Sequence, residues 1–125
     1  MTYIIDPHRS ERTTMNIIWT SKENLDKRSL YIHTRGSNIA LKDVEDGTLI
    51  DPAEIVIYED ENSKAETQTI TSVIDTDGTH YATNSRFFRE DLQNIHSIMT
   101  PDPYQIIVRK QVSKAGRTFV TCELA

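Results

Sequence analysis

The sequence is poor in the residues that mark several common classes of protein. Among 125 residues there is one cysteine, Cys122, and the four glycines stand apart at positions 36, 47, 78 and 116. A single cysteine excludes an intrachain disulfide, and isolated glycines exclude a glycine-rich phosphate-binding loop. No apolar run reaches the length of a signal peptide core or a membrane-spanning helix. We therefore expect a cytoplasmic protein with no membrane partner.

Histidines and carboxylates do not show the spacings of metal sites or active sites. The four histidines are scattered at positions 8, 33, 80 and 96, without a His-x-x-x-His or Cys-x-x-Cys pair. The carboxylates of residues 43–61 lack the regular spacing of a calcium-binding loop. Cys122 lies in a predicted terminal strand, where it is expected to be a small core residue. These absences predict no enzyme activity, no metal, no cofactor and no small-molecule substrate.

Charge is abundant but unevenly distributed. The net charge is −5, yet residues 43–77 hold one basic and eleven acidic side chains, while residues 1–42 and 104–125 each carry +3. The stretch RKQVSKAGRTFV, residues 109–120, contains four basic side chains and no acidic one. Salt screens exposed charges beyond roughly 10 Å, so a basic groove is compatible with an acidic protein.

The hydrophobic periodicity predicts one mainly β (α+β) domain. We expect residues 1–13 to form an N-terminal arm and residues 14–125 to form the domain. Strands are predicted at residues 15–20, 53–60, 67–75, 104–112 and 117–124, with hairpins at residues 29–44 and around Asp77–Gly78. Strand 67–75 alternates with period two, which predicts one buried face and a Thr/Ser face in water.

One segment, residues 84–99, has the period of a helix instead. Phe88, Leu92, Ile95 and Met99 follow at spacings of four, three and four, which places them on one face. Asn84 or Ser85 is the expected N-cap, and the following TPDP ends the helix. Strands, one helix and a final hairpin match the order of the OB-like small barrels that bind oligonucleotides. The alternative is an open antiparallel sheet backed by one helix, paired as a dimer.

Basic and aromatic residues together indicate single-stranded nucleic-acid binding. Proteins of this kind combine a positive groove for phosphates with rings on which bases stack. The alternative is that tyrosines in strands are half-buried packing residues and that hairpin lysines keep edges soluble. The candidates for phosphate contact are Lys110, Lys114, Arg117 and Arg86, and the candidates for stacking are Tyr58, Tyr81, Tyr31 and Trp19.

From about Leu41 to the C-terminus the sequence resembles the single-stranded DNA-binding protein of protein-primed (short-tailed) double-stranded DNA phages. The blocks that carry the resemblance occur in the same order: LKDVEDGTLI, AEIVIY, ETQTITSVI, DGTHYATNSRFF and SKAGRTFVTCEL. The first 40 residues match this pattern poorly. The resemblance implies a protein that coats displaced single strands during phage DNA replication, in the host cytoplasm and without sequence preference. Single-stranded DNA is then the partner, and self-association is left open.

The resemblance also implies particular stacking residues. The family's tyrosines correspond to Tyr58, ten residues after Thr48, and to Tyr81, which follows the second Asp-Gly. A third family tyrosine falls in the acidic loop, which is shorter here and has no aromatic residue. Tyr31 or Trp19 is expected to substitute for it.

The acidic segment, residues 43–77, has two interpretations. In the first, it lies on the far side of the molecule from a sheet face shared by Tyr58, Tyr81 and the cations of the final hairpin. In the second, its carboxylates imitate phosphates, and the protein is an acidic nucleic-acid mimic that inhibits a host nuclease. The basic ends of the chain count against the second interpretation.

Overall fold

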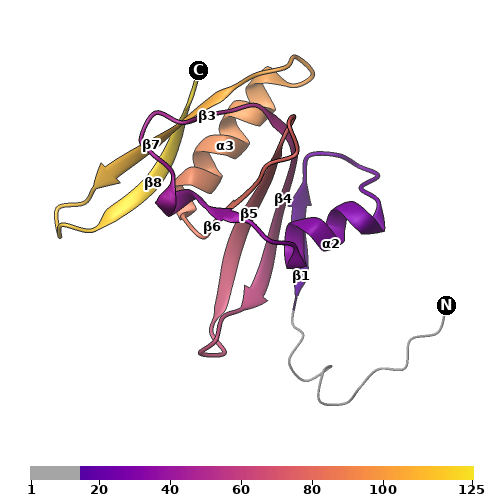
Figure 1. Ribbon diagram of the computed structural model, residues 1–125, viewed down its shortest axis with the longest axis horizontal. Coiled ribbons are helices and arrows are strands. Elements are labelled where there is room, and N and C mark those ends of the chain that lie inside the picture. The colour runs from indigo at the N-terminus through magenta and orange to yellow at the C-terminus, as the bar shows by residue number, and fades with distance from the viewer. Residues whose placement is uncertain (1–14) are drawn as a thin grey trace.

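The computed structural model describes residues 15–125, so the expected arm at residues 1–13 lies outside the described part (Figure 1). Along this part the elements are β1 (Asn16–Thr20), α2 (Lys27–Arg35), β2 (Ile39–Ala40), the 3₁₀ helix η1 (Leu41–Asp43), β3 (Leu49–Ile50), β4 (Pro52–Glu61), β5 (Thr67–Asp75), β6 (His80–Thr83), α3 (Arg86–Met99), β7 (Ile106–Val112) and β8 (Thr118–Leu124). In residues 15–125, neither α2 nor α3 has the length and apolar character needed to cross a membrane.

Two β-sheets frame this part of the chain. Sheet A has the strand order β1-β4-β5-β6-β2, and sheet B has the order β3-β7-β8. Neighbouring strands are antiparallel except for β2, which is parallel to β6. Asp51 alone connects β3 with β4, so the chain changes sheets there without sharing a strand between them. The α+β class is confirmed, whereas the OB-like closed barrel is wrong for the described residues.

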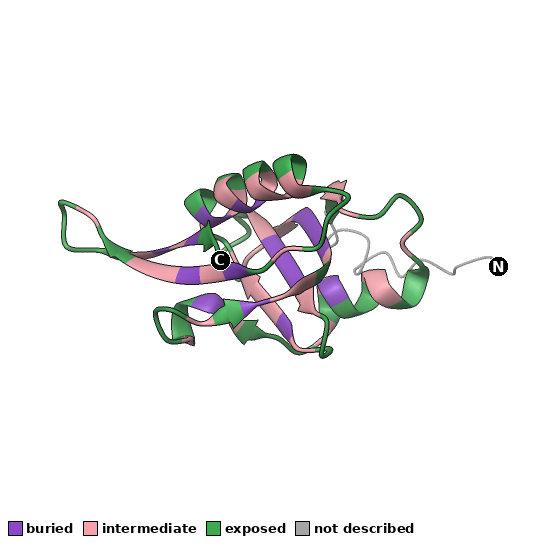
Figure 2. Cartoon of the chain, turned by 90° about the horizontal axis from the view of Figure 1, so that it is seen from above, coloured by how far each residue is buried: buried purple, intermediate pink, exposed green. Residues whose placement is uncertain are grey.

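The hydrophobic core lies between the two sheets and helix α3. Figure 2 shows the buried residues gathered in the middle of the molecule. Ser85 caps α3, because its side chain accepts a hydrogen bond from the Phe88 amide at 3.2 Å. The predicted apolar stripe is confirmed, and Cys122 is a core residue as predicted. The buried cluster consists of Leu41, Ile50, Ile55, Ile57, Val73, Phe88, Leu92, Ile106, Val108, Val120 and Cys122.

Residues 27–35 form helix α2, where the sequence predicted the first strand of a hairpin. The Asp26 carboxylate accepts a hydrogen bond from the Ser29 amide at 2.7 Å, which caps the helix. The Gly36 amide donates to the Ile32 carbonyl at 3.0 Å and ends it. The apparent alternation of Leu30 and Ile32 was misleading, because Ile32 is 39 % exposed and the buried side chain is His33. The expectation of a single helix is therefore wrong.

Helix α2 also changes the environment of β5. The sequence predicted a wet Thr/Ser face for this strand, but Thr71 and Ser72 are only 1 % and 0 % exposed. Thr71 lies on the same face as Val73, which belongs to the core. Ser72 lies on the other face, where it contacts His33 of α2. The centre of β5 is thus covered on both faces.

Candidate nucleic-acid interface

Strand register places Tyr58 and Tyr81 on opposite faces of sheet A. Tyr58 pairs with Ile70 of β5, and Tyr81 pairs with Val73 of the same strand. Residues opposite each other in register share a face, and residues three apart in one strand do not. The expected surface shared by both tyrosines is therefore not observed.

The four predicted stacking residues have very different exposures. Tyr58 is 5 % exposed, and Tyr31 on α2 is 65 % exposed. Tyr81 is half-buried against the core. Trp19 is also half-buried, with its ring edge-on to His96 of α3 at 5.3 Å between centroids. Their contact with DNA remains a prediction, with Tyr31 the most accessible of the four.

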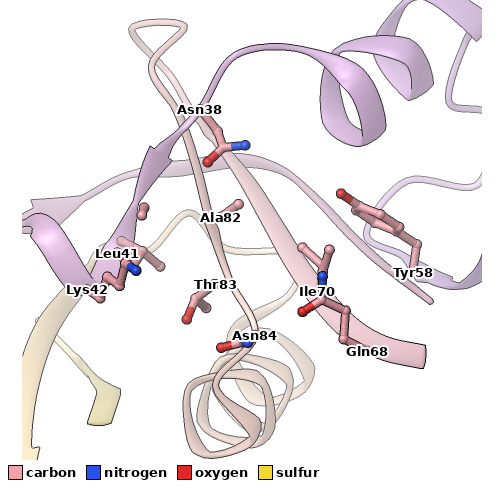
Figure 3. A pocket seen from close by; sticks show the side chains of 10 residues that line it. Asn38, Leu41, Lys42, Tyr58, Gln68, Ile70, Ala82, Thr83 and Asn84 are labelled. Carbon is pink, nitrogen blue, oxygen red and sulfur yellow. The ribbon is translucent and has the colours of Figure 1, made fainter. Parts of the chain in front are cut away.

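A groove opens beside Tyr58, on the face of sheet A that also carries α2. Its cavity volume is about 270 Å³. Figure 3 shows Tyr58 at one end and Lys42 of η1 at the other, with Ile70 and Ala82 between them. We call this the β5–β6 groove; its lining residues are Asn38, Ala40, Leu41, Lys42, Tyr58, Gln68, Ile70, Ala82, Thr83 and Asn84.

The lining of the β5–β6 groove suits a nucleotide. Ile70 and Ala82 offer an apolar floor, while Asn38, Gln68 and Asn84 supply amides that both donate and accept hydrogen bonds. Burial, aided by the nearby Asp60 carboxylate, raises the pKa of Tyr58, so its hydroxyl keeps its proton near neutral pH and can donate it. Lys42 adds one exposed cation for a phosphate.

The basic hairpin β7–β8 is connected to this groove through η1. The Lys110 ammonium donates a hydrogen bond to the Lys42 carbonyl. The Asp46 carboxylate accepts from the Lys110 amide at 2.8 Å. Asp46 also lies 3.6 Å from the Arg109 guanidinium, which donates to Glu123 at 3.3 Å. The loop at Asp46 therefore lies against the hairpin, which corrects the expectation that the whole acidic segment is on the far side.

Lys114 and Arg117 lie at the exposed tip of the hairpin. Neither side chain makes an ion pair with any residue in the range 15–125. The tip is closed by the Ser113 amide, which donates to the Arg117 carbonyl at 2.8 Å. Arg86, the remaining predicted phosphate contact, is exposed on α3 and donates to Glu90 at 2.9 Å. Lys114 and Arg117 are therefore exposed cations without an ion pair in residues 15–125, and their contact with phosphates remains a prediction.

A second part of the acidic segment does lie away from the hairpin. The tips of β4–β5 and β7–β8 project from the body in different directions (Figure 1). Near the β4–β5 tip, Asp60 accepts a hydrogen bond from Arg35 of α2 at 2.8 Å. The carboxylates near the β4–β5 tip are thus separated from Lys114 and Arg117.

A buried polar network connects α2 with sheet A. His33 contacts the Ser72 hydroxyl at 2.7 Å and the Glu54 carboxylate at 3.2 Å, and Ser72 also contacts His80 at 2.6 Å. Ser, His and Glu in this order form the active sites of some hydrolases. Here Ser72 is 0 % exposed, so no substrate can reach its hydroxyl. The network holds α2 on the sheet, and no group of three or more His, Cys, Asp or Glu side chains in residues 15–125 is arranged to hold a metal ion.

The network predicts that stability falls in mild acid. Burial lowers the pKa of His33 and of His80 below the ordinary 6.5, and the hydrogen bond to Glu54 only partly offsets this for His33. The unfolded chain takes up protons near pH 6.5, whereas the folded protein resists them. The unfolding free energy should therefore be highest above pH 7 and decrease from pH 6.5 downwards, as measured by urea unfolding at pH 7.5 and pH 5.5.

A histidine substitution controls this measurement. His33→Asn should lower stability at pH 7.5 but reduce the difference between the two pH values. The same difference in His33→Asn as in the unchanged protein would contradict a contribution of His33, because His80 and His96, whose pKa values burial also lowers, would then account for it.

Comparison with protein families decides the class of ligand. Residues 16–125 match the family described as phage single-stranded DNA-binding protein. The chain belongs to this family. The chain therefore binds single-stranded DNA in phage DNA replication, and nothing supports the nuclease-inhibitor alternative. None of the curated proteins and none of the solved structures compared with it matches.

The family match extends the resemblance seen in the sequence. It begins at Asn16 rather than near Leu41, so β1 and α2 belong to the family domain. Sequence reasoning also missed the groove residues Lys42, Gln68 and Asn84. Gln68 could have been found from the sequence, because it stands two residues before Ile70 and therefore lies on the same face of β5. Asn84 had already been named, but only as a helix cap.

Proposed function

We propose that the phage single-stranded DNA-binding protein holds its strand along a path from the β5–β6 groove to the tip of hairpin β7–β8. The observation that carries this proposal is the hydrogen bond from the Lys110 ammonium to the Lys42 carbonyl. Lys42 lines the groove and Lys110 belongs to the hairpin, so the groove and the basic hairpin meet at this contact. Lys114 and Arg117 extend the same line of positive charge outwards.

The chemistry along this path fits binding without sequence preference. Amides and hydroxyls of the groove can accept or donate, so they can meet the edge of any base. The hairpin cations meet phosphates, which are the same for every sequence. The Tyr58 hydroxyl is placed for a hydrogen bond at the groove rather than for face-on stacking, because its ring is nearly covered.

The protein acts in this proposal as a stoichiometric coat and not as an enzyme. The burial of Ser72 in its Ser-His-Glu network supports this, since no substrate can reach this arrangement, which resembles an active site. The site of action we propose is the host cytoplasm, which suits the unpaired, buried thiol of Cys122. Neighbouring copies would lie side by side on the strand, where β1, an edge strand among the described residues with exposed Ile17 and Ile18, is available for contact between copies.

Charge reversal at the groove tests the path. Lys42→Glu should weaken binding to oligo-dT about five-fold or more at 0.1 M salt, because one phosphate contact on a single strand releases about 0.7 counterions. The slope of log affinity against log salt should become shallower by about 0.7. Fluorescence titration at several salt concentrations measures both quantities.

Lys64→Glu is the matched control. Lys64 lies in the loop between β4 and β5, is exposed and does not line the groove, so its substitution changes the net charge equally outside the proposed path. The proposal requires Lys42→Glu to weaken binding clearly more than Lys64→Glu. Equal effects would show that only overall charge matters and would remove the groove from the binding site.

A further inference from the structure

An aromatic pair lies where α3 meets the basic hairpin, and it consists of the exposed Phe87 and the half-buried Phe119. Phe87 of α3 and Phe119 of β8 have ring centroids 5.0 Å apart and planes inclined by 44°. Phe87 is 52 % exposed, although it lies next to the fully buried Phe88. A large apolar ring left half in water at such a place calls for an explanation.

Contacts other than this pair also attach α3 to the core and to sheet B. Phe88 and Leu92 anchor the helix in the core at 0 % exposure. The Ser85 hydroxyl adds a hydrogen bond to the Val120 carbonyl at 2.6 Å. Phe87 lies about 100° around the helix from Phe88, and its ring packs on Phe119 at the rim of the core while remaining 52 % exposed.

The charges around the pair favour a phosphate-bearing ligand. Arg86 precedes Phe87 with a side chain 73 % exposed, and Arg117 lies two residues before Phe119 in the hairpin. Arg86 is paired with Glu90, but this ion pair is exposed on both sides and contributes little, so a phosphate can compete for Arg86. Glu90 accepts the hydrogen bond from Arg86 at 2.9 Å. Asp91 is part-buried, and burial raises its pKa.

We propose that Phe87 and Phe119 form a stacking platform for a nucleobase of the bound strand. The proposal rests on the path described under Proposed function and adds a subsite to it. An unpaired base has an aromatic face that stacks on a phenyl ring whatever its sequence. Its flanking phosphates would meet Arg86 on one side and Arg117 on the other.

The platform lies close to the groove along the chain. Asn84 lines the β5–β6 groove and stands three residues before Phe87, across the N-terminus of α3. Lys110 pairs with Val120 and Phe119 pairs with Gln111, so Phe119 and Lys110 lie on opposite faces of the hairpin. In this proposal the strand reaches the platform past Asn84 and the N-terminus of α3, not along Lys110. This gives the strand a base-binding position between the groove and the cations of the tip.

Leucine substitutions test the platform, because leucine keeps apolar contact but has no aromatic face. Phe87→Leu and Phe119→Leu should each weaken oligo-dT binding about 5- to 150-fold, the range for loss of one stacked base. The salt dependence should stay unchanged, since no charge is removed. Ile98→Ala, at an apolar side chain 78 % exposed on the same helix, is the control and should bind normally.

A crosslinking experiment gives a readout independent of affinity. Oligo-dT carrying 5-iodouracil, irradiated in complex with the unchanged protein, should form adducts on the peptides that contain Phe87 or Phe119. Normal affinity in both leucine variants, or adducts only elsewhere, would overturn the platform. If Lys42→Glu still weakens binding in that case, the path stands without the platform; if it does not, both proposals fail.

Discussion

Reversing the charge of Lys114 and Arg117 together is expected to weaken binding to oligo-dT at least about 25-fold at 0.1 M salt. Each phosphate contact on a single strand contributes roughly 0.7 to the salt exponent, which is about five-fold in affinity between 1 M and 0.1 M salt. Two lost contacts multiply to about 25-fold, and two new carboxylates repel the strand further. The salt slope should become shallower by about 1.4.

These two residues are suited to this test because, among residues 15–125, their side chains make no ion pair and no hydrogen bond. Both are exposed at the hairpin tip and form no ion pair within residues 15–125. The double variant should therefore unfold at the temperature of the unchanged protein. Lys64→Glu serves again as the charge control. A salt slope equal to that of the unchanged protein would exclude the hairpin tip from the phosphate path.

Phe88→Ala is expected to lower the unfolding free energy by about 3–5 kcal/mol, which is the range for removing a buried phenylalanine. Phe88 is 0 % exposed and lies where α3 meets both sheets. Domains of this size are stable by only about 5–15 kcal/mol, so the variant should lose much of its folded population on mild heating. Urea unfolding measures the change.

The neighbouring residue provides a sharp comparison. Phe87→Ala removes the same side chain at 52 % exposure, and it should cost less than about 1 kcal/mol of stability. Phe88→Ala should thus lower the unfolding free energy, whereas Phe87→Leu, the variant used to test the platform, should lower the affinity for oligo-dT. Equal destabilisation by the two alanine substitutions would show that the Phe87–Phe119 pair stabilises the packing of α3 as strongly as the core does, and this would contradict its assignment as a surface feature.

The strands, helix α3 and the final hairpin were predictable because each has a local signal. Strand 67–75 and the stripe from Phe88 to Met99 have the periods of a strand and a helix, and both were confirmed. Helix α2 was missed because its nine residues also alternate for a few positions. The cap at Asp26 and the one-turn spacing of Leu30 and His33 were the signals that favoured a helix.

The site was less predictable than the elements that carry it. Basic residues of the hairpin could be recognised from their spacing, but the groove depends on pairings between distant segments. Lys42 and Tyr58 line one hollow only because η1 and β4 lie on either side of β5 and β6. The face on which a tyrosine lies depends on strand register, so Tyr58 and Tyr81 looked equivalent in the sequence and are not.

The sequence alone determined the family, the uneven charge, the order of the later elements and the basic hairpin, because these follow from residue types and their short-range spacing. The tertiary structure decided which aromatic rings are exposed, that part of the acidic segment neutralises Arg109, and that Phe87 is outside while Phe88 is inside. Burial and ion pairing are set by residues far apart in the chain, and packing two sheets and two helices in the described residues is what brings them together.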